Sequence, residues 1–286
     1  MTVQDATYHI LNQLRSIYEE TEAAQITDWV MEKITGSKKA ERMLYKNSML
    51  THDEENQVQS MAERLMRHEP VQYVLNESWF CGLKFYVDKN VLIPRPETEE
   101  LVEWIIANCK FPVDSLKILD IGSGSGCIPI SLKRRLKKAE VWSCDISPDA
   151  LKIARQNAAS LGTAVNFIQM DFLDQKEWDQ LPSFDIIVSN PPYVPEKDKG
   201  TMKPNVLQYE PATALFVPDN DPLIFYKAIA EFGKVHLNTS GSIYCEIHED
   251  LGKEVIRIFN SHAFKTELKK DMHQKDRMLK AAKANG

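Results

Sequence analysis

The stretch Ile118-Leu119-Asp120-Ile121-Gly122-Ser123-Gly124-Ser125-Gly126 decides the fold. An apolar run of strand type over residues 118–121 leads directly into three glycines spaced two residues apart, and a helical pattern follows to about Leu136. Glycines between a strand and a helix let the backbone turn sharply and approach a ligand, and the helix N-terminus offers free amide donors. The stretch therefore predicts a ligand-binding loop at the end of a strand.

Strand and helix patterns alternate beyond this loop. Further strands are expected at residues 141–146, 165–170, 186–188 and 241–247, with helices at 148–161 and 221–237. This alternation is typical of a mostly parallel sheet with helices on both faces, so we predict an α/β domain over residues 95–286. In such a sheet the strand ending at Ile121 lies beside the strand ending at Ser189, at the switch point where ligands bind.

The N-terminal part of the chain has a helical pattern instead, and it predicts a small helical bundle over residues 1–75. Gly36 ends one of its helices, and Thr51-His52-Asp53-Glu54 forms a capping box that opens another. Period-two alternation then predicts a linking β-hairpin within residues 76–94, with Asp88-Lys89-Asn90 as a turn before Val91-Leu92-Ile93.

Composition limits the partners of the protein. A chain of 286 residues can bury one good core and a second, smaller unit, and its net charge of -6 argues against extensive contact with a phosphate backbone. The five cysteines form no C-x-x-C pair, which predicts neither a disulfide framework nor a metal site. No apolar run is long enough for a signal peptide or a membrane span. We expect a cytoplasmic protein without direct contacts to nucleic acid or membrane.

The spacing of the glycines distinguishes between cofactors. A dinucleotide fingerprint, G-x-G-x-x-G, would need a third glycine where Cys127 stands. The observed G-x-G-x-G follows an acid, Asp120, by two residues. This form suits a nucleoside that carries an amino acid, whose ammonium group would pair with the Asp120 carboxylate.

Two further acids are expected at successive strand ends. Asp145, about 20 residues beyond the loop, is placed to accept both ribose hydroxyls of a nucleoside. Asp171 offers an acceptor for an exocyclic amine, and Phe172 offers a ring that can stack on adenine. Helix or turn capping would explain one such aspartate, but three in register favour a binding site.

The stretch Asn190-Pro191-Pro192-Tyr193 follows a strand of buried type, residues 184–189. Each proline pushes the residue before it into an extended conformation and removes a backbone donor, so the turn is stiff. The Asn190 side-chain oxygen and the Pro191 carbonyl can then accept from one amide or amine nitrogen. Tyr193 is expected to close the pocket with its flat face.

Together these motifs resemble a class I S-adenosylmethionine-dependent methyltransferase that alkylates nitrogen. The segment Ile93-Pro94-Arg95-Pro96-Glu97-Thr98-Glu99, the hairpin before it and the N-terminal helical unit resemble the peptide chain release factor glutamine methyltransferases (PrmC/HemK family). The likeness covers nearly the whole chain. It implies a Rossmann-like, mostly parallel seven-stranded sheet that is preceded by the bundle and the hairpin.

The resemblance carries the family's roles to particular residues of this chain. It implies that the following residues bind the cofactor: Asp120, Gly122, Ser123, Gly124, Ser125, Gly126, Asp145, Asp171, Phe172 and Asn190. The catalytic and substrate-binding set is Asn190, Pro191, Pro192 and Tyr193, with Arg95 and Glu97 on the substrate side. Arg95 alone would also fit a structural role at a helix start. Glu210 and Glu246 match the family pattern without an assigned role, and Asn76 stands where the family often has glycine.

The resemblance implies that the substrate is a class I release factor, methylated at the glutamine of its Gly-Gly-Gln loop. An adenine methyltransferase acting on DNA or RNA would use the same acceptors after base flipping, but it should carry a basic face or a base-recognition domain, and neither is evident. A non-catalytic S-adenosylmethionine-binding module remains an alternative, against which the intact Asn190 and the complete glycine loop argue. The mismatch at Cys127 disfavours a nicotinamide dehydrogenase.

Overall fold

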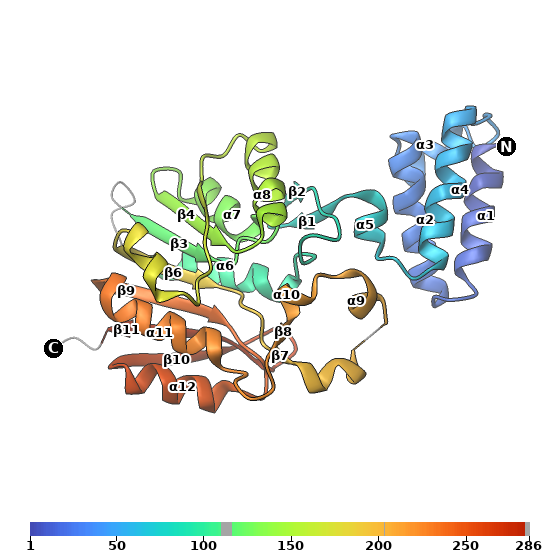
Figure 1. Ribbon diagram of the computed structural model, residues 1–286. Helices are drawn as coiled ribbons and strands as arrows, with labels where there is room; N and C mark the ends of the chain where they lie inside the picture. Colours follow the sequence, from blue (N-terminus) through green and yellow to red (C-terminus); the bar gives the residue numbers. More distant parts are fainter. Residues whose placement is uncertain (110–115, 203, 284–286) are drawn as a thin grey trace. The chain divides into compact units, whose positions relative to one another are not determined.

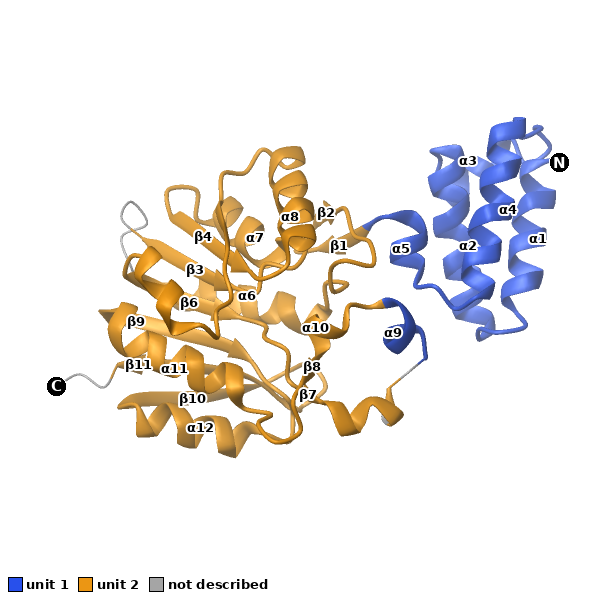
Figure 2. Cartoon of the chain, in the orientation of Figure 1, with its two compact units in different colours: residues 1–77, 203–209 blue, residues 78–202, 210–286 orange. Residues whose placement is uncertain are grey.

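The computed structural model of the protein describes residues 1–109, 116–202 and 204–283 (Figure 1). The chain divides into two units (Figure 2). We call residues 1–77 with 203–209 the helical unit, and residues 78–202 with 210–286 the sheet unit. The α/β domain expected over residues 95–286 includes positions 110–115, 203 and 284–286, which lie outside the described residues.

The helical unit is built from amphipathic helices around an apolar core. Its helices are α1 (Val3–Leu14), α2 (Glu20–Thr35), α3 (Lys39–Leu44), α4 (His52–Met66), α5 (Val71–Leu75) and α9 (Pro204–Tyr209). The expected helix signals are confirmed: the Thr51 side chain accepts from the Glu54 amide at the start of α4, and Gly36 ends α2 in a left-handed conformation. Ile10 and Leu14 of α1 are fully buried in this core.

The sheet unit alternates strands and helices as expected. Its strands are β1 (Ser78–Phe80), β2 (Leu83–Phe85), β3 (Lys117–Ile121), β4 (Glu140–Asp145), β5 (Asn166–Gln169), β6 (Phe184–Ser189), β7 (Val194–Pro195), β8 (Phe216–Val217), β9 (Leu237–Glu246), β10 (Phe264–Lys270) and β11 (Asp276–Lys283). Its helices are α6 (Pro96–Asn108), α7 (Cys127–Arg135), α8 (Pro148–Ser160), η2 (Gln175–Gln180), η3 (Glu196–Thr201), α10 (Ala212–Leu215), α11 (Ile224–His236) and α12 (Gly252–Ser261).

A seven-stranded sheet forms the centre of this unit, in the order β10-β11-β9-β6-β3-β4-β5. The strands from β5 to β9 in this order pair in parallel, whereas β11 pairs antiparallel with both β9 and β10. The predicted mostly parallel, seven-stranded α/β fold is therefore confirmed. Ile121 of β3 stands opposite Ser189 of β6, so the two expected neighbours are paired at their carboxyl ends.

Successive residues of each central strand face opposite helical layers. Ile118 packs in the core that contains α6, α7 and α8, and the next residue, Leu119, packs in the core that contains α11 and α12. Figure 1 shows these helices on the two faces of the sheet. Because both faces are covered, β3 and β6 carry apolar residues at successive positions rather than only at alternating ones.

The linking hairpin lies within residues 76–94, as expected, but its turn comes earlier in the chain than predicted. Strands β1 and β2 are joined by Cys81 and Gly82, both with positive φ, which is the geometry of a two-residue hairpin turn. The expected turn at residues 88–90 is a local one instead, because the Asp88 carboxylate accepts from the Asn90 amide, and the buried residues that follow form no strand. Asn76 takes a positive φ of 52°, as its place in the family pattern suggested.

None of the helices within the described ranges combines the length and the apolar character that crossing a bilayer requires.

Candidate active site

A cavity of about 400 Å³ opens at the carboxyl ends of β3, β4 and β6. We call it the strand-end cavity. The residues that sequence analysis singled out and that line it are Arg95, Gly122, Ser123, Gly124, Ser125, Asp145, Asp171, Phe172, Asn190, Pro191 and Pro192. The glycine loop and the Asn-Pro-Pro turn meet here because β3 and β6 are hydrogen-bonded neighbours, and the Ser189 hydroxyl also donates to the Ile121 carbonyl at 2.7 Å.

The three glycines of the loop do different things. Gly122 and Gly124 have positive φ, and a Cβ built on either would meet no atom within 4 Å. These two positions leave room for a ligand against bare backbone. Gly126 also has positive φ, but its Cβ would stand 2.9 Å from the Ile130 side chain and 3.2 Å from Ala154 Cβ. Gly126 therefore serves the close packing of α7 on α8, and it is absent from the lining of the cavity.

A buried asparagine of α8 holds the glycine loop from behind. The Asn157 side chain donates to the Ser125 carbonyl and to the Tyr86 carbonyl, each at 2.9 Å, and accepts from the Tyr86 amide at 2.7 Å. Only 2% of this residue is exposed. One side chain thus ties the loop to the segment that follows the hairpin.

Asp145 lies at the end of β4, as expected, and its carboxylate accepts from the Gly124 amide and from the Ser147 amide, each at 2.9 Å. Burial raises the pKa of this carboxyl, and the two backbone amides partly offset the rise. The residue after it, Ile146, is 57% exposed and lines the same cavity. Ile146 was not among the predicted site residues, although its signal was visible in the sequence as an apolar residue directly after a strand-end acid.

Asp120 is placed differently from the expectation. Its side chain is fully buried and does not line the cavity. One carboxylate oxygen accepts from the Ser143 hydroxyl at 2.6 Å, and that hydroxyl lies 2.6 Å from the hydroxyl of Ser123 in the glycine loop. The other oxygen has no hydrogen-bond partner among the described residues. Burial raises the pKa of Asp120 to about 8.

Asp171 and Phe172 both line the cavity beyond the end of β5. The Asp171 carboxylate accepts from the Leu173 amide at 3.0 Å. The Phe172 ring, however, packs on Trp178 and Phe232 with ring centroids 5.6 and 5.3 Å away, and the residue is 5% exposed. Most of the ring surface expected to stack on a base is therefore already covered within the core.

The Asn190 side chain lies at the mouth of a hydrogen-bonded group of side chains. Its Nδ2 donates to the Thr98 hydroxyl at 3.0 Å, and that hydroxyl donates to Glu246 Oε2 at 2.6 Å. The Tyr193 hydroxyl donates to Glu246 Oε1 at 3.1 Å. Tyr193 thus supports the turn from behind and is absent from the lining of the cavity, where a closing ring was expected. Burial raises the pKa of the Glu246 carboxyl, and the two hydroxyl donors oppose that rise.

Thr98 was missed as a site residue. It lies in the first turn of α6, and the sequence around it indicated only a well-formed helix start. In the structure it is 3% exposed and lines the cavity. Its spacing from Leu101, Val102 and Ile105 places it on the buried face of α6. A threonine on an otherwise apolar helix face was the available signal.

Arg95 lines the cavity, whereas Glu97 does not. The Arg95 guanidinium donates to Glu210 Oε1 at 2.6 Å, and the Glu210 side chain is 1% exposed. The other Glu210 oxygen accepts from the Ile93 amide at 3.4 Å. Glu210 therefore connects the long loop after β7 to the segment that begins α6, which gives a position to a residue that the sequence left without a role.

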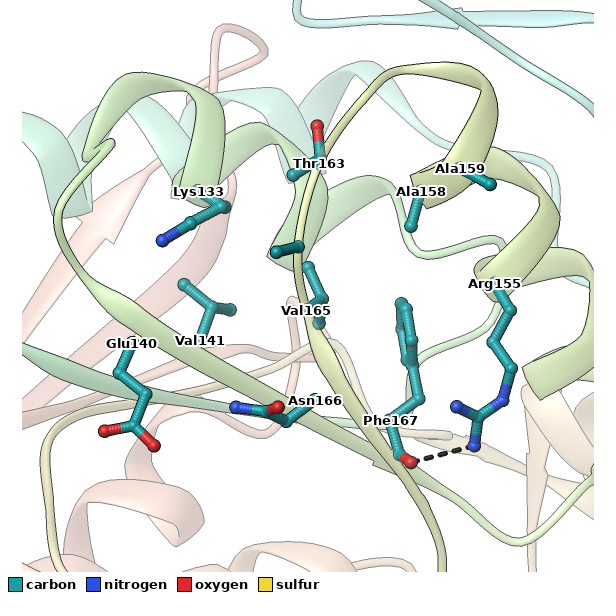
Figure 3. Close-up of a pocket in the computed structure, with 11 residues that line it drawn as sticks. Lys133, Glu140, Val141, Arg155, Ala158, Ala159, Thr163, Val165, Asn166 and Phe167 are labelled. Atoms are coloured by element: carbon teal, nitrogen blue, oxygen red, sulfur yellow. Dashed lines mark hydrogen bonds between the residues drawn. The ribbon is translucent and has the colours of Figure 1, made fainter.

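A second cavity, of about 390 Å³, lies at the amino ends of β4 and β5. We call it the strand-start cavity. Figure 3 shows it between α7 and α8, with Arg155 directed at the Phe167 carbonyl. Arg155 donates to this carbonyl at 2.8 Å, and Lys133 donates to the Ala139 carbonyl at 2.6 Å. Ligands of parallel α/β sheets bind at the carboxyl ends of the strands, so the strand-end cavity is the candidate site.

The strand-end cavity fits the nucleoside cofactor that its motifs indicate. Bare backbone at Gly122 and Gly124 admits a close ligand, Asp145 presents a carboxylate at a strand end, and the unpaired Asp120 oxygen lies behind the loop. Within the described ranges no group of three or more metal-ligating side chains comes together. A Rossmann-like sheet with this loop and an Asn-Pro-Pro turn in one cavity defines a class I methyltransferase that uses S-adenosylmethionine as its methyl donor.

Comparison with known proteins identifies the family. A methyltransferase domain profile matches residues 112–285, and a PrmC N-terminal domain profile matches residues 5–75. The release factor glutamine methyltransferase of Flavobacterium psychrophilum is 42% identical over 283 residues, which cover 98% of this chain and 99% of that protein. The counterpart from Bacteroides thetaiotaomicron is 41% identical over an aligned region that covers 96% of this chain and 98% of that protein. The chain belongs to the release factor glutamine methyltransferase family.

Proposed function

We propose that this protein methylates the side-chain amide nitrogen of the glutamine in the Gly-Gly-Gln loop of class I peptide chain release factors, and that it thereby supports translation termination in the cytoplasm. The observation that carries the proposal is the shared cavity: Asn190 and Pro191 line the same space as the glycine loop Gly122–Ser125. The names of the relatives support the choice of substrate.

The site works chiefly by positioning. A primary carboxamide is a poor nucleophile because its nitrogen lone pair is delocalised, so the nitrogen must be held close to the reacting carbon and aimed at it. Asn190 Oδ1 and the Pro191 carbonyl oxygen accept from the two hydrogens of that nitrogen. Two acceptors also favour the positive charge that develops on nitrogen during transfer.

Bound S-adenosylmethionine supplies an electrophilic methyl group on a sulfonium centre. The residues proposed to hold it are those of the glycine loop, with Asp145 at the ribose and Ile146 against the base. With the cofactor bound, the transfer would replace one substrate N–H by N–CH₃, break the bond between the methyl carbon and sulfur to leave a neutral thioether, and release the displaced proton to water. The nitrogen carries a positive charge once it is alkylated, and its protons are then strongly acidic, so no side chain needs to act as a strong base.

The two units have separate roles in this proposal. Residues 1–75 recognise the release factor, residues 76–94 link the units, and residues 95–286 carry out the transfer. The match of residues 5–75 to the N-terminal domain of the family supports the first assignment. A nucleic-acid substrate has no comparable support from the net charge of -6.

The direct test incubates the protein with methyl-labelled S-adenosylmethionine and a purified class I release factor, and locates the added mass by peptide mass spectrometry. We expect one methyl group on the Gly-Gly-Gln glutamine. A release factor with alanine at that glutamine is the matched control and should take up no label. Label on an adenine-containing oligonucleotide, or on neither substrate, would overturn the proposal.

A further inference from the structure

A line of hydrogen-bonded side chains runs from Asn190 at the cavity to a carboxyl group in the interior. It passes through Thr98 to Glu246, and Tyr193 closes it on the far carboxylate oxygen. Thr98 and Glu246 are 3% and 1% exposed, so water cannot replace these partners. The transfer described above uses neither residue. Burying a carboxyl group here is unfavourable in itself, and its place at the end of this line calls for a physical reason.

The hydrogen-bond donors and acceptors along the line fix the orientation of the Asn190 side chain. A carboxylate can only accept, so the single hydroxyl hydrogen of Thr98 is committed to Glu246. The Thr98 oxygen is then available to Asn190 only as an acceptor. The NH₂ group of the Asn190 amide must therefore face Thr98, and Oδ1, the other terminal atom of the amide, points away from Thr98.

This orientation matters because the two ends of a carboxamide have nearly the same shape and opposite hydrogen-bonding roles. With Oδ1 presented to the substrate, Asn190 accepts from the substrate nitrogen. After a half-turn of the amide, the NH₂ group would face that nitrogen and repel its hydrogens. The site would then favour a substrate amide that is itself reversed, with its oxygen where the nitrogen must stand.

We propose that Thr98, with Glu246 and Tyr193 behind it, is the positioning residue that holds the Asn190 amide with its oxygen toward the substrate nitrogen. The inference rests on the proposed amide methylation, because only a nitrogen that donates hydrogens requires this orientation. It predicts that these side chains affect turnover rather than the binding of S-adenosylmethionine.

The first test uses variants that change hydrogen bonding with little change of shape. Thr98→Val removes the hydroxyl, and we expect kcat to fall roughly 10–100-fold while the Kd for S-adenosylmethionine stays within about 2-fold. Thr98→Ser restores the hydroxyl and should recover most of the rate. Glu246→Gln replaces one of the two acceptor oxygens by a donor, so the Thr98 hydrogen can point at Asn190 whenever the new NH₂ group faces Thr98, and kcat should fall by less than in Thr98→Val.

Two tyrosines provide a matched control. The Tyr226 hydroxyl donates to the backbone carbonyl of Glu246 at 3.1 Å, the same distance at which Tyr193 reaches the carboxylate. Tyr193→Phe should lower kcat several-fold. Tyr226→Phe should lower the melting temperature and leave kcat within about 2-fold, because that bond lies outside the line. Equal losses of kcat in the two variants would show a general packing effect and overturn the inference.

A second readout does not depend on the substrate. The side-chain amide resonances of Asn190, assigned by their loss in Asn190→Ala, should show one Nδ2 proton in a hydrogen bond in the wild type, and this signature should disappear in Thr98→Val. A wild type that does not methylate release factor would refute the proposed function while these resonances still report the orientation. Normal methylation with unchanged kcat and unchanged resonances in Thr98→Val would refute the inference alone.

Discussion

These two cavities of the sheet unit have almost the same volume, about 400 and 390 Å³, yet they lie at opposite ends of the parallel strands. In the strand-start cavity the cationic groups of Lys133 and Arg155 already donate to backbone carbonyls. The strand-end cavity instead combines glycines of positive φ with the carboxylates of Asp145 and Asp171 and a proline-braced amide. The volume of a cavity therefore does not identify a functional site. A functional site is identified by side chains and backbone groups that the stability of the fold does not itself require.

The strongest test of this contrast removes the amide of the strand-end cavity. Asn190→Ala deletes one of the two proposed acceptors, so we expect kcat to fall about 10²–10³-fold. Isothermal titration should give a nearly unchanged affinity for S-adenosylmethionine, because the glycine loop is untouched. Turnover equal to that of the wild type would remove Asn190 from the chemistry.

Gly126→Ala tests whether the third glycine of the loop serves packing. The new Cβ would take an unfavourable φ of +80° and stand 2.9 Å from the Ile130 side chain. The free energy of unfolding should fall by about 2–4 kcal/mol, measured by denaturant titration. Gly162→Ala is the control, since Gly162 has φ +60° with open space around it, and it should lose only about 1–2 kcal/mol. Equal losses of unfolding free energy in the two variants would show that the contacts of position 126 with α8 do not contribute to stability.

Asp145→Ala sharpens the cofactor side of the comparison. Loss of a carboxylate that holds the loop amide of Gly124 and faces the cavity should weaken S-adenosylmethionine binding about 10–100-fold. Asp149→Ala, in the first turn of α8, removes a nearby carboxylate that does not line the cavity. Its affinity should match the wild type, and a parallel loss in both variants would indicate only a change in net charge.

Asp120, buried behind the glycine loop, gives the stability of the protein a pH dependence. Its pKa is raised by burial from 3.8 to about 8, so the folded state binds this proton more tightly than the unfolded state does. The stabilisation is complete below the unfolded pKa and is lost as pH rises toward the folded pKa. Between pH 5 and 8 the unfolding free energy of the ligand-free protein should fall less steeply in Asp120→Asn, by up to about 1.4 kcal/mol per pH unit. Parallel curves would contradict this.

The smallest effect is expected at the strand-start cavity. Arg155→Lys keeps the charge but loses the planar donor group that bonds the Phe167 carbonyl. We expect kcat and cofactor affinity to remain within about 2-fold of the wild type, with at most about 1 kcal/mol of lost stability. A larger change in turnover would make this cavity functional and break the contrast.

Much of this arrangement could be predicted from sequence because it depends on local pattern. The glycine loop after a short apolar strand predicted the pairing of β3 with β6, and this placed the loop beside Asn190. The predicted position of the hairpin turn was wrong, because the Asp88-Lys89-Asn90 pattern indicates a turn equally well whether or not strands flank it. Asn76 and the cap at Thr51 were foreseen because each depends on only a few neighbouring residues.

What could not be predicted depends on contacts between distant residues. Thr98 and Glu246 are 148 positions apart, and a helix-start threonine looks the same in sequence whether it faces water or a carboxylate. Phe172 lies at the expected strand end, but its covered ring follows from the positions of Trp178 and Phe232. Gly122 and Gly126 likewise differ only in what lies across from them.

The three bonds of the Asn157 side chain have one more consequence. An apolar residue of similar size at this position would leave the carbonyls of Ser125 and Tyr86 and the amide of Tyr86 without partners in a dry interior. Amino-acid substitution at position 157 is thus constrained by three main-chain groups at once, and none of these groups touches the reacting atoms. Inherited variation that damages the enzyme can accordingly arise at a helix residue that lies 32 positions along the chain from Ser125 and belongs to none of the catalytic motifs.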